Sequence, residues 1–450
     1  MSSPSTEPEK SGNGGSKHRL SGRIHIVGSD NGALFIAHSL ASRRSVPPIT
    51  LLLNDFDSYQ NWMDAKQSIS LQANGLEDIK TGFDVNVRRG KDTWYSVPPE
   101  TEQVEDRNDD TLESDGDFIG AAEPEARGTV QFQEDDSKIE CVIIPVRSNW
   151  TVLAVESIKH RLTPDSTILI LSDGLGTMEE INRHCYPDPE TRPHFMQGVF
   201  THYIRRRKRG FQFYHAQLGT LVLGVPPQDG RLSPAEADKI YWTQSWADST
   251  RYLMRMLTTT APLVATAAAP TDLLLTQLEQ IAIQSVLQPL TALMGFTNGA
   301  TLYNYHFTRV MRLLLLETCS IIAALPEVRA IPGMDVRFGP ERIRRMITQV
   351  AERTAGQESN MLRDINANRI TEIQFLNGYI VRRGEELGVK PVMNYLIQAL
   401  IQGKTYEARQ KEISAIPIDV PADGQKQDSR SARTSELDRR MLPPFDRSTK

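Results

Sequence analysis

The first half of the chain alternates between short apolar runs and amphipathic stretches, a pattern that predicts an α/β domain. Arg23–Gly28 ends in apolar residues and breaks at a glycine, and a helical run that contains Leu34 and Phe35 follows. Ile49–Leu53 is a second continuous apolar run, which is typical of a buried parallel strand. This succession of strand, tight turn, helix and strand predicts a βαβ unit of the dinucleotide-binding kind.

Later apolar runs extend the predicted sheet. Cys141–Val146 and Thr167–Leu171 are continuous apolar segments, and Thr151–Leu162 between them has helical spacing. We expect the two apolar segments to be further buried strands. Phe211–His215 and Thr220–Gly224 also have the pattern of strands, and the short connection between them predicts a hairpin that covers the edge of the sheet.

From Ser233 onward the apolar positions recur with a helical period. Ser233 and Pro234 form a helix start, with serine as the N-cap and proline at the first helical position. Further helices are expected at Asp248–Met256, Asp272–Met294, Tyr305–Ala324, Pro340–Glu352, Ile373–Leu387 and Pro391–Gln402. The predicted fold class is therefore α/β plus all-α. A Rossmann-like parallel sheet domain at 21–230 precedes a helical C-terminal domain at 231–415, with a cleft between the two.

Three segments have a composition that favours solvated chain. Residues 1–20 and 416–450 are polar and predict disordered tails. Residues 98–138 form an acidic insertion in the sheet domain, where carboxylates far outnumber Arg107 and Arg127. Such a block repels itself and buries little surface. It is either a solvated insertion between two sheet elements or an interaction segment for a basic partner.

The composition is that of a globular protein with a sizeable core, and it narrows the function classes. Of the 450 residues, 39% are hydrophobic and 24% are charged, and the net charge of −5 excludes a globally cationic nucleic-acid binder. Cys141, Cys185 and Cys319 are widely spaced and odd in number, which argues against a disulfide framework. The histidines show no metal-ligand spacing, so no metal site is expected.

The chain shows no run of about 18 apolar residues, so no membrane span is expected. The N-terminal stretch also lacks the apolar core of a secretory signal. We therefore expect a mitochondrial or cytoplasmic protein that is not secreted.

One dense basic run stands out. Arg205–Arg209 holds four arginines and a lysine, and Tyr203 and Phe211 flank it. It is either a solvated hairpin tip or a phosphate contact to RNA, and it could also dock an acidic surface, including the acidic insertion of the chain itself.

The turn after the first strand carries an incomplete dinucleotide fingerprint. The positions of the G-x-G-x-x-G/A pattern fall on Gly28, Asp30 and Ala33. Gly28 suits the tight turn and Ala33 the close packing of helix on strand. Asp30 stands where a glycine would let the backbone approach the pyrophosphate, and its carboxylate repels that group. Alternatively, Asp30 is the N-cap of the helix.

Several separated motifs resemble one family. Leu287–Leu293 is followed by Asn298-Gly299, and Asn360–Ile365 leads into Thr371–Gly378. Together with Gly198–His202, these segments resemble the ketopantoate reductase (2-dehydropantoate 2-reductase) family over residues 23–403, as a divergent member of fungal mitochondrial type. The resemblance implies a C-terminal domain of the 6-phosphogluconate-dehydrogenase-like type. It also implies that NADPH reduces a small 2-keto acid, ketopantoate, to pantoate on the route to pantothenate.

The resemblance also assigns roles to individual positions. It places the catalytic positions on Gln280, Glu372 and Asn298, and the substrate-binding positions on Gln284, Gln288 and Asn360. The family has a lysine where Gln280 stands, and glutamine cannot serve as a cationic acid. No lysine lies between Lys239 and Lys390 to take its place. The catalytic positions are therefore eroded.

The cofactor positions implied by the resemblance are Gly28, Asp30, Ala33, Asn54, Arg147 and Asp173. Asn54 replaces the arginine that contacts the 2′-phosphate of NADPH, while Arg147 preserves the charge of a lysine. Asp173 replaces an asparagine and adds negative charge, so NADPH binding is expected to be weakened.

Two functions of different classes follow. The first is a ketopantoate-reductase-like enzyme whose activity is weak or lost. The second is a non-catalytic scaffold or regulator, for example a mitochondrial translation activator that contacts RNA or a ribosome through Arg205–Arg209. The expected partners are a small 2-keto acid for the enzyme, a second copy of the chain, and no membrane.

Overall fold

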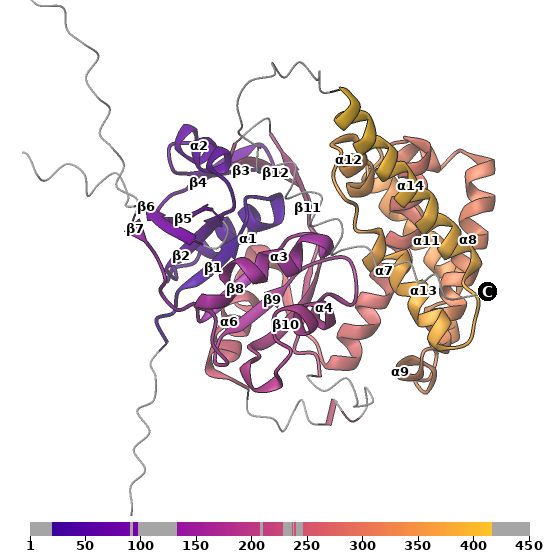
Figure 1. Ribbon diagram of the computed structural model, residues 1–450, viewed down its shortest axis with the longest axis horizontal. Helices are drawn as coiled ribbons and strands as arrows, with labels where there is room; N and C mark the ends of the chain where they lie inside the picture. Colours follow the sequence, from indigo (N-terminus) through magenta and orange to yellow (C-terminus); the bar gives the residue numbers. More distant parts are fainter. Residues whose placement is uncertain are drawn as a thin grey trace, which may run out of the picture.

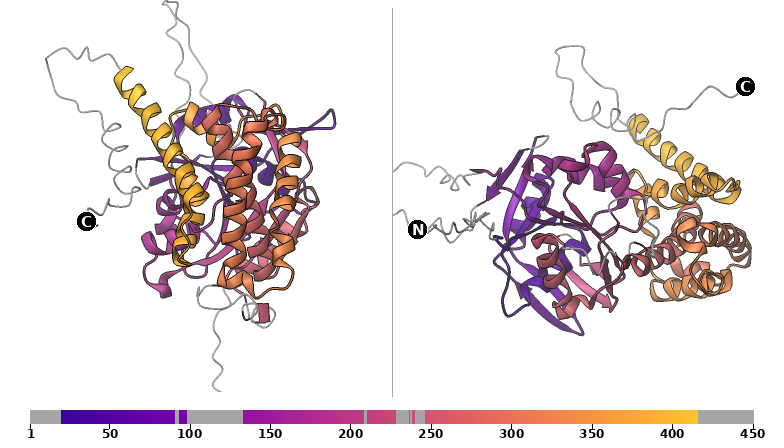
Figure 2. Two further views of the ribbon diagram at one scale, coloured as in Figure 1. Left: turned by 90° about the vertical axis from the view of Figure 1, so that its right-hand side faces the viewer. Right: turned by 90° about the horizontal axis from the view of Figure 1, so that it is seen from below.

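The computed structural model describes residues 20–90, 93–97, 133–207, 210–227, 236, 238–239 and 246–415. Within them the chain forms a sheet domain and a helical domain (Figure 1). The right-hand view of Figure 2 shows the orange and yellow helices as a separate body beside the indigo-to-magenta sheet domain. The two predicted tails lie outside the described residues, apart from residue 20, and so does the helix start at Ser233. Residues 98–132 of the acidic insertion and positions 208–209 of the basic run lie outside them as well.

The main sheet of the sheet domain has ten strands. These are β1 (Ile24–Val27), β2 (Ile49–Leu53), β5 (Asp84–Arg89), β6 (Thr93–Val97), β7 (Gln133–Glu134), β8 (Cys141–Ile144), β9 (Thr167–Ile170), β10 (His194–Phe200), β13 (Leu221–Gly224) and β14 (Ala265–Ala267). Their order is β14-β13-β10-β9-β8-β1-β2-β5-β6-β7, and the strands from β10 to β5 are parallel. The order reverses between β1 and β8, where sheets of this kind bind ligands beyond the carboxyl ends of the strands.

A second sheet has four strands in the order β11-β12-β3-β4. They are β3 (Ile69–Ala73), β4 (Leu76–Lys80), β11 (Tyr203–Arg206) and β12 (Gln212–Gln217). The prediction of a hairpin between Phe211–His215 and Thr220–Gly224 is wrong. The first segment pairs with β11 and β3, and the second pairs with β10 in the main sheet. The turn at Gly219 connects the two sheets, and its Cβ position lies 2.3 Å from the Thr201 backbone.

Helices cover both faces of the main sheet. They are α1 (Asn31–Ala41), α2 (Phe56–Asp64), α3 (Ser148–Ile158), α4 (Thr177–His184) and α6 (Asp248–Thr258). α1, α2 and α6 share one apolar core with the second sheet, and α3 and α4 form another core on the opposite face. β14 and α6 follow residue 231, where the sequence predicts the helical domain to begin. The structure places both in the sheet domain, because β14 pairs with β13 and α6 packs on β8 and β9.

The helical domain therefore begins with α7. Its helices are α7 (Pro270–Met294), α8 (Tyr305–Ala324), α9 (Pro326–Arg329), α10 (Met334–Arg337), α11 (Pro340–Arg353), α12 (Asn360–Asn366), α13 (Asn377–Glu386) and α14 (Val392–Ala415). Their apolar faces meet in one core built around α7, α8 and α11. The predicted helices over Asp272–Met294 and Tyr305–Ala324 correspond to α7 and α8, and the bounds of α8 agree to the residue.

A proline inside α7 explains part of the family motif. Pro289 has no N–H, so the carbonyl of Ser285 one turn earlier loses its helical partner. Asn377 donates from Nδ2 to that carbonyl at 2.9 Å, and the Asn377 side chain is fully buried. The motif around Pro289 and the start of α13 therefore depend on each other, and together they fix the helix that carries Gln280, Gln284 and Gln288.

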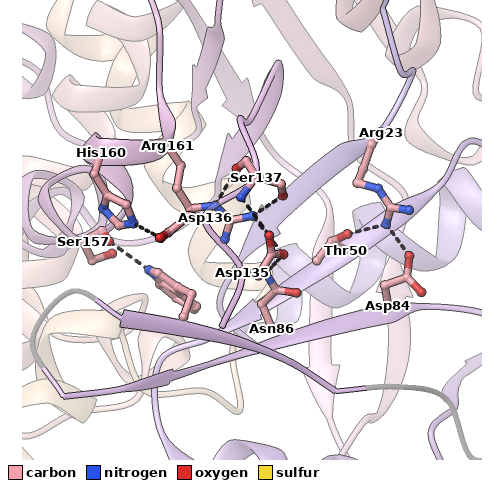
Figure 3. Close-up of polar contacts among 11 residues, drawn as sticks. Arg23, Thr50, Asp84, Asn86, Asp135, Asp136, Ser137, Ser157, His160 and Arg161 are labelled. Atoms are coloured by element: carbon pink, nitrogen blue, oxygen red, sulfur yellow. Dashed lines mark hydrogen bonds and ion pairs between the residues drawn. The ribbon is translucent and has the colours of Figure 1, made fainter. Parts of the chain in front are cut away.

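Buried polar groups gather where β1, β2 and β5 begin (Figure 3). Arg161 is fully buried and donates from Nε to the Ser137 carbonyl at 2.9 Å and from Nη2 to Asp135 at 3.2 Å. Asn86 donates to the same Asp135 oxygen at 2.6 Å. We call Arg161, Asp135, Asn86 and Ser137 the amino-edge cluster. It joins the strand after the acidic insertion to the rest of the sheet.

Candidate active site at the domain junction

The turn after β1 keeps part of the geometry of a dinucleotide site. Gly28 has φ +87°, which favours glycine, and its N–H donates to the Leu52 carbonyl at 2.8 Å. Ala33 is fully buried, so α1 packs closely against the sheet. α1 begins directly beyond the carboxyl end of β1, beside the switch point, and the N–H groups in the first turn of a helix attract anions.

Asp30 and Asn54, two of the predicted cofactor positions, are exposed. Asp30 has extended backbone at the N-cap position of α1, but its side chain accepts no capping hydrogen bond. Its carboxylate instead lies within electrostatic reach of Arg147. Asn54 is exposed beyond β2, and the next residue, Asp55, caps α2 by accepting from the Ser58 N–H at 2.6 Å.

Arg147 follows β8 and links the two domains. Its guanidinium forms a close ion pair with Asp364 on α12, whose side chain is 1% exposed. Arg369 also pairs with Asp364, at 3.0 Å. Burial lowers the pKa of Arg147, and the nearby charges of Glu372 and Asp30 oppose that shift. The arginine therefore stays cationic at the junction.

Asp173 follows β9 and meets the helix that carries the family's lysine position. Gln280 on α7 donates from Nε2 to Asp173 Oδ1 at 3.1 Å. Burial raises the pKa of Asp173, while this hydrogen bond and the charge of Arg147 lower it. The sequence-predicted residues Asp173 and Gln280 are thus brought together across the domain junction.

Glu372 is one of two almost completely buried carboxyl groups of this region, with 1% of its surface exposed; the other is Asp364. Ser148 at the start of α3 donates from Oγ to Glu372 Oε2 at 3.3 Å and accepts from the Gly174 N–H at 3.0 Å. The other carboxyl oxygen, Oε1, has no hydrogen-bond partner among the described residues. A buried oxygen without a partner is energetically costly.

The electrostatics of Glu372 differ from those of an ordinary carboxylate. Burial raises its pKa to about 7, and repulsion from Asp173 contributes to the rise. Arg147, Ser148 and Gln288 act in the opposite direction. Near neutral pH the group therefore exchanges a proton readily, which is what general acid–base chemistry requires. We call Arg147, Ser148, Asp173, Gln280, Asp364 and Glu372 the junction cluster.

Backbone contacts close the junction around this cluster. The Leu175 N–H donates to the Phe375 carbonyl at 3.1 Å, and Asn149 donates to the Ile370 carbonyl at 2.8 Å. A Cβ at Gly174 would lie 2.4 Å from Phe375, so only glycine permits this approach. The glycine after Asp173 therefore allows the helical domain to reach the sheet edge.

The remaining glutamines continue along α7. Gln288 donates to Gln284 at 3.1 Å and accepts from the Met361 N–H at 3.2 Å. Asn360, at the start of α12, accepts a close hydrogen bond from Arg363. These predicted substrate positions form a neutral polar strip that leads from Gln280 to α12.

Asn298 has different neighbours. It lies after the end of α7, donates to Thr354 Oγ1 at 2.8 Å, and its Oδ1 has no partner among the described residues. At about 1.5 Å per residue, the helix between Gln280 and Met294 spans about 20 Å. No hydrogen bond or ion pair among the described residues joins Asn298 to the junction cluster, so the structure brings the other predicted catalytic positions together without it.

Ser148 and Asp364 were missed by the sequence reasoning. Asp364 lies inside the motif that starts at Asn360, but its role follows only from the ion pair with Arg147. Ser148 has no signal of its own beyond following Arg147.

Metal and membrane features complete the description. The described residues contain no group of three or more His, Cys, Asp or Glu side chains that could hold a metal ion. Within the described residues, no helix is long and apolar enough to cross a membrane.

A parallel sheet with a switch point, a helical partner domain and buried ionisable groups at their junction define a two-domain dehydrogenase architecture. The chain belongs to the ketopantoate reductase family. The family model for ketopantoate reductase PanE/ApbA matches residues 80–228, and the model for its C-terminal domain matches residues 272–405.

Individual relatives agree with this membership. The chain is 25% identical over 270 residues to a probable 2-dehydropantoate 2-reductase of Schizosaccharomyces pombe, covering 59% of this chain and 74% of the relative. It is 24% identical over 399 residues to the ketoisovalerate reductase BEA2 of Gibberella fujikuroi, covering 80% and 77%.

Solved structures show the same fold at low identity. D-mandelate dehydrogenase with NADH and anilino(oxo)acetate has a TM-score of 0.57 at 14% identity, covering 86% of this chain and 99% of that one. A dimeric ketopantoate reductase of Staphylococcus aureus has a TM-score of 0.53 at 14% identity with the same coverage. The prediction of an α/β domain followed by a helical domain is confirmed.

Proposed function

We propose that this protein is a slow reductase of a small 2-keto acid that uses a reduced nicotinamide dinucleotide. The single observation that carries the proposal is Glu372. This buried carboxyl has a pKa of about 7, and its Oε1 atom has no hydrogen-bond partner among the described residues. It lies at the junction of a dinucleotide-type sheet and a helical domain. Strongly perturbed ionisable groups in such positions are candidates for functional sites.

The residues around the switch point fit a dinucleotide in part. Gly28 provides the turn, Ala33 the close helix packing, and the first turn of α1 the N–H groups for a pyrophosphate. When bound, the dinucleotide supplies the hydride. Asp30 opposes the pyrophosphate charge and makes the affinity low, while Arg147 offsets that charge.

The preferred dinucleotide follows from Asn54. NADPH is the cofactor of the family, but the 2′-phosphate needs a cation that Asn54 does not provide. Asn54 and Asp55 instead offer oxygen atoms that accept from a ribose 2′-hydroxyl. We therefore expect the protein to discriminate little between NADPH and NADH.

The chain's own groups then handle the keto acid. Arg147, held by Asp364, offers positive charge to the substrate carboxylate, and Gln280, Gln284 and Gln288 offer neutral hydrogen bonds. Protonated Glu372 gives its proton to the carbonyl oxygen as hydride reaches the carbonyl carbon, which leaves a 2-hydroxy acid and an ionised carboxylate. Solvent returns the proton afterwards. Turnover is slow because the proton donor is a carboxyl group that burial keeps protonated, in place of the cationic lysine of the family.

A combined binding and turnover experiment tests this function. Titration with NADPH and with NADH should give saturable thermal stabilisation of the full chain, because a ligand that binds only the folded state raises its melting temperature. Ketopantoate and ketoisovalerate, the substrates named for the relatives, should then oxidise the bound dinucleotide. The rate should fall above about pH 7, as Glu372 loses its proton.

Matched variants separate catalysis from binding. Glu372→Gln should abolish turnover while keeping dinucleotide stabilisation, because the amide cannot donate an acidic proton. Gln280→Lys should raise kcat by at least about tenfold, because it restores a cationic acid beside Asp173. A chain that shows no stabilisation by either dinucleotide, and no rescue by Gln280→Lys, would contradict the reductase.

A specific observation favours a second candidate, a non-catalytic scaffold or regulator. The polar groups of the junction cluster are engaged with one another across the two domains, as in a structural joint. In this case Arg205–Arg207, of which Arg205 and Arg206 lie on β11, would contact RNA or a ribosome, as in a mitochondrial translation activator. Salt-sensitive RNA retention without dinucleotide binding would support this candidate.

The compartment and the assembly remain part of the proposal. We propose a mitochondrial or cytoplasmic protein, which imaging of a C-terminally tagged chain checks. The dimeric state of the Staphylococcus aureus enzyme supports a homodimer. Light scattering of the purified full chain should give twice the monomer mass of 50.5 kDa, and a monomer mass would overturn the homodimer.

A further inference from the structure

A cavity of about 240 Å³ lies between the two domains, and none of the junction cluster lines it. One wall is the β11–β12 hairpin, with Tyr203, Arg205 and Gln217. The other wall is the end of α11, with Arg353, and the loop that follows it, with Gln357. Figure 1 shows β11 on the side of the sheet domain that faces the helical domain. A ligand in this cavity would contact both domains.

The lining of the cavity is cationic. Arg205 and Arg353 contribute two guanidinium groups, and no carboxylate lines the cavity. Within the described part of the chain neither arginine has an ion-pair partner, whereas Arg337 and Arg383 each pair with a glutamate. Two unpaired cations on facing walls attract an anion between them.

A buried hydroxyl adds a donor at the same place. The Tyr203 hydroxyl is inaccessible to solvent and has no hydrogen-bond partner among the described residues. Burial raises the Tyr203 pKa, and the positive charges of Arg205 and Arg363 oppose the shift. The hydroxyl therefore stays protonated and can donate, and its desolvation is offset only when an acceptor arrives.

The loop wall is held rigidly. Asn298 donates from its N–H to the Gln357 carbonyl at 2.7 Å and from its side chain to Thr354 at 2.8 Å. The next residue, Gly299, donates to the Ala355 carbonyl at 3.0 Å. Because these contacts order the loop in advance, a ligand does not bear the entropy of ordering it.

A larger surface cavity adjoins the first one. It has a volume of about 520 Å³, shares Arg205 and Ala216 with the smaller cavity, and adds Arg206 and Tyr214. The Arg207 guanidinium lies over the Tyr214 ring, 5.8 Å from its centre. The cationic lining therefore continues outward, with room for the body of a ligand whose anionic end occupies the inner cavity.

We propose that the interdomain cavity binds the phosphate group of a phosphorylated small molecule. Arg205 and Arg353 donate to the phosphate oxygens from opposite walls, and the Tyr203 hydroxyl donates a further hydrogen bond. Guanidinium groups suit this task because their fork of N–H donors matches the geometry of phosphate oxygens. The site does not depend on the proposed reductase chemistry, since the two sites share no residue.

Inorganic pyrophosphate is a suitable probe for the full chain, by calorimetry and thermal shift at matched ionic strength. We expect saturable binding that Arg205→Gln and Arg353→Gln each weaken about tenfold, the loss typical of one charge-assisted contact. Tyr203→Phe should weaken it a few-fold. Arg345→Gln removes the same charge from an exposed position on α11 outside the cavity, and it should bind like the wild type. Circular dichroism checks that each variant is folded.

Three results would contradict the phosphate site. Affinity that survives Arg353→Gln would place pyrophosphate elsewhere, for example at the switch point, and would overturn the proposal. If Arg345→Gln lost as much pyrophosphate affinity as Arg353→Gln, the binding would be unspecific attraction to positive charge, and the proposal would also be overturned. So would a single-stranded RNA that binds where pyrophosphate does not. Glu372→Gln should leave pyrophosphate affinity unchanged, so a failed reductase and a failed phosphate site are distinguishable.

Discussion

The amino-edge cluster and the junction cluster both hold buried charge, yet their electrostatics run in opposite directions. In the amino-edge cluster, burial raises the pKa of Asp135, but hydrogen bonds from Ser137 and Asn86 and the charge of Arg161 outweigh it, and the net shift is downward. In the junction cluster, burial and Asp173 raise the pKa of Glu372 to about 7 despite Arg147. One carboxylate is stabilised in its charged form and the other is not.

The difference lies in how many donors reach each carboxylate. The amino-edge cluster lies within one domain, where Asn86, Ser137 and Arg161 all donate to Asp135 (Figure 3). The junction cluster joins two domains, and one oxygen of Glu372 has no donor among the described residues. The contrast concerns the two carboxylates, because Arg161 Nη1 in the amino-edge cluster also has no hydrogen-bond partner among the described residues. A carboxylate that accepts from several donors is typical of a structural role, and one whose pKa is raised near neutrality is a candidate for function.

The largest expected effect is the loss of Arg161. Arg161→Met keeps the volume but removes the charge, so Asp135 loses its ion pair and Ser137 its donor. We expect the free energy of unfolding to fall by about 3 kcal/mol, as for other broken buried pairs. Urea denaturation at neutral pH measures this. The control is Asp136→Asn, because the Asp136 carboxylate is exposed and pairs only with His160 among the described residues. This substitution should change the free energy of unfolding little. A loss no larger than the control's would show that the amino-edge cluster is not structural.

A smaller effect of opposite sign is expected at Glu372. Its pKa is raised in the folded state, so its contribution to stability is complete below the unfolded value of about 4.3 and is lost as the pH rises through about 7. Glu372→Gln removes the buried charge, and at about pH 8 the variant should be more stable than the wild type by up to about 3 kcal/mol, less what the amide loses in hydrogen bonding. Thermal denaturation from acidic to basic pH measures the difference, which should vanish on the acidic side. Equal stability throughout would mean that Glu372 ionises without hindrance.

The smallest effect is expected for Asp135→Asn. The pKa of Asp135 is lowered in the folded state, so its contribution is present above the unfolded value and is lost as the pH falls through the folded one. The variant should lose about 1 kcal/mol at neutral pH, because one charged acceptor becomes neutral. The loss should disappear in acid, which is the reverse of the pH dependence of Glu372→Gln. The same denaturation series compares both, and slopes of equal sign would remove the contrast between the clusters.

Continuous apolar runs allowed several elements to be predicted from the sequence. The bounds of β2 and α8 agree to the residue. β2 is buried along its whole length, whereas α8 begins after Asn304, whose side chain accepts from the Phe307 N–H, and ends shortly before Pro326. The motif residues around Pro289 and Asn377 also mark real structural constraints, since each supplies what the other lacks. The predicted positions Gln280, Asp173, Arg147 and Glu372 meet at one junction.

Other features had no local signal. The β3 to β6 region and the short β14 went unpredicted, because short strands that mix polar and apolar residues resemble loops in sequence. The segments Phe211–His215 and Thr220–Gly224 look like a hairpin, yet they belong to different sheets. A period-two pattern shows that a segment is a strand but not which strand pairs with it.

The amino-acid pattern was enough to predict a sheet domain followed by a helical domain, most buried elements in their order, the family, and the lack of lysine between Lys239 and Lys390. The folded chain was needed to show that Asp364 pairs with Arg147, that Glu372 is buried with one unpartnered oxygen, and that Arg205 and Arg353 line the same cavity. The two kinds of feature depend on interactions of different range. Strand and helix formation depend on neighbours along the chain, whereas the charge state of a side chain depends on groups that folding brings to it from distant segments.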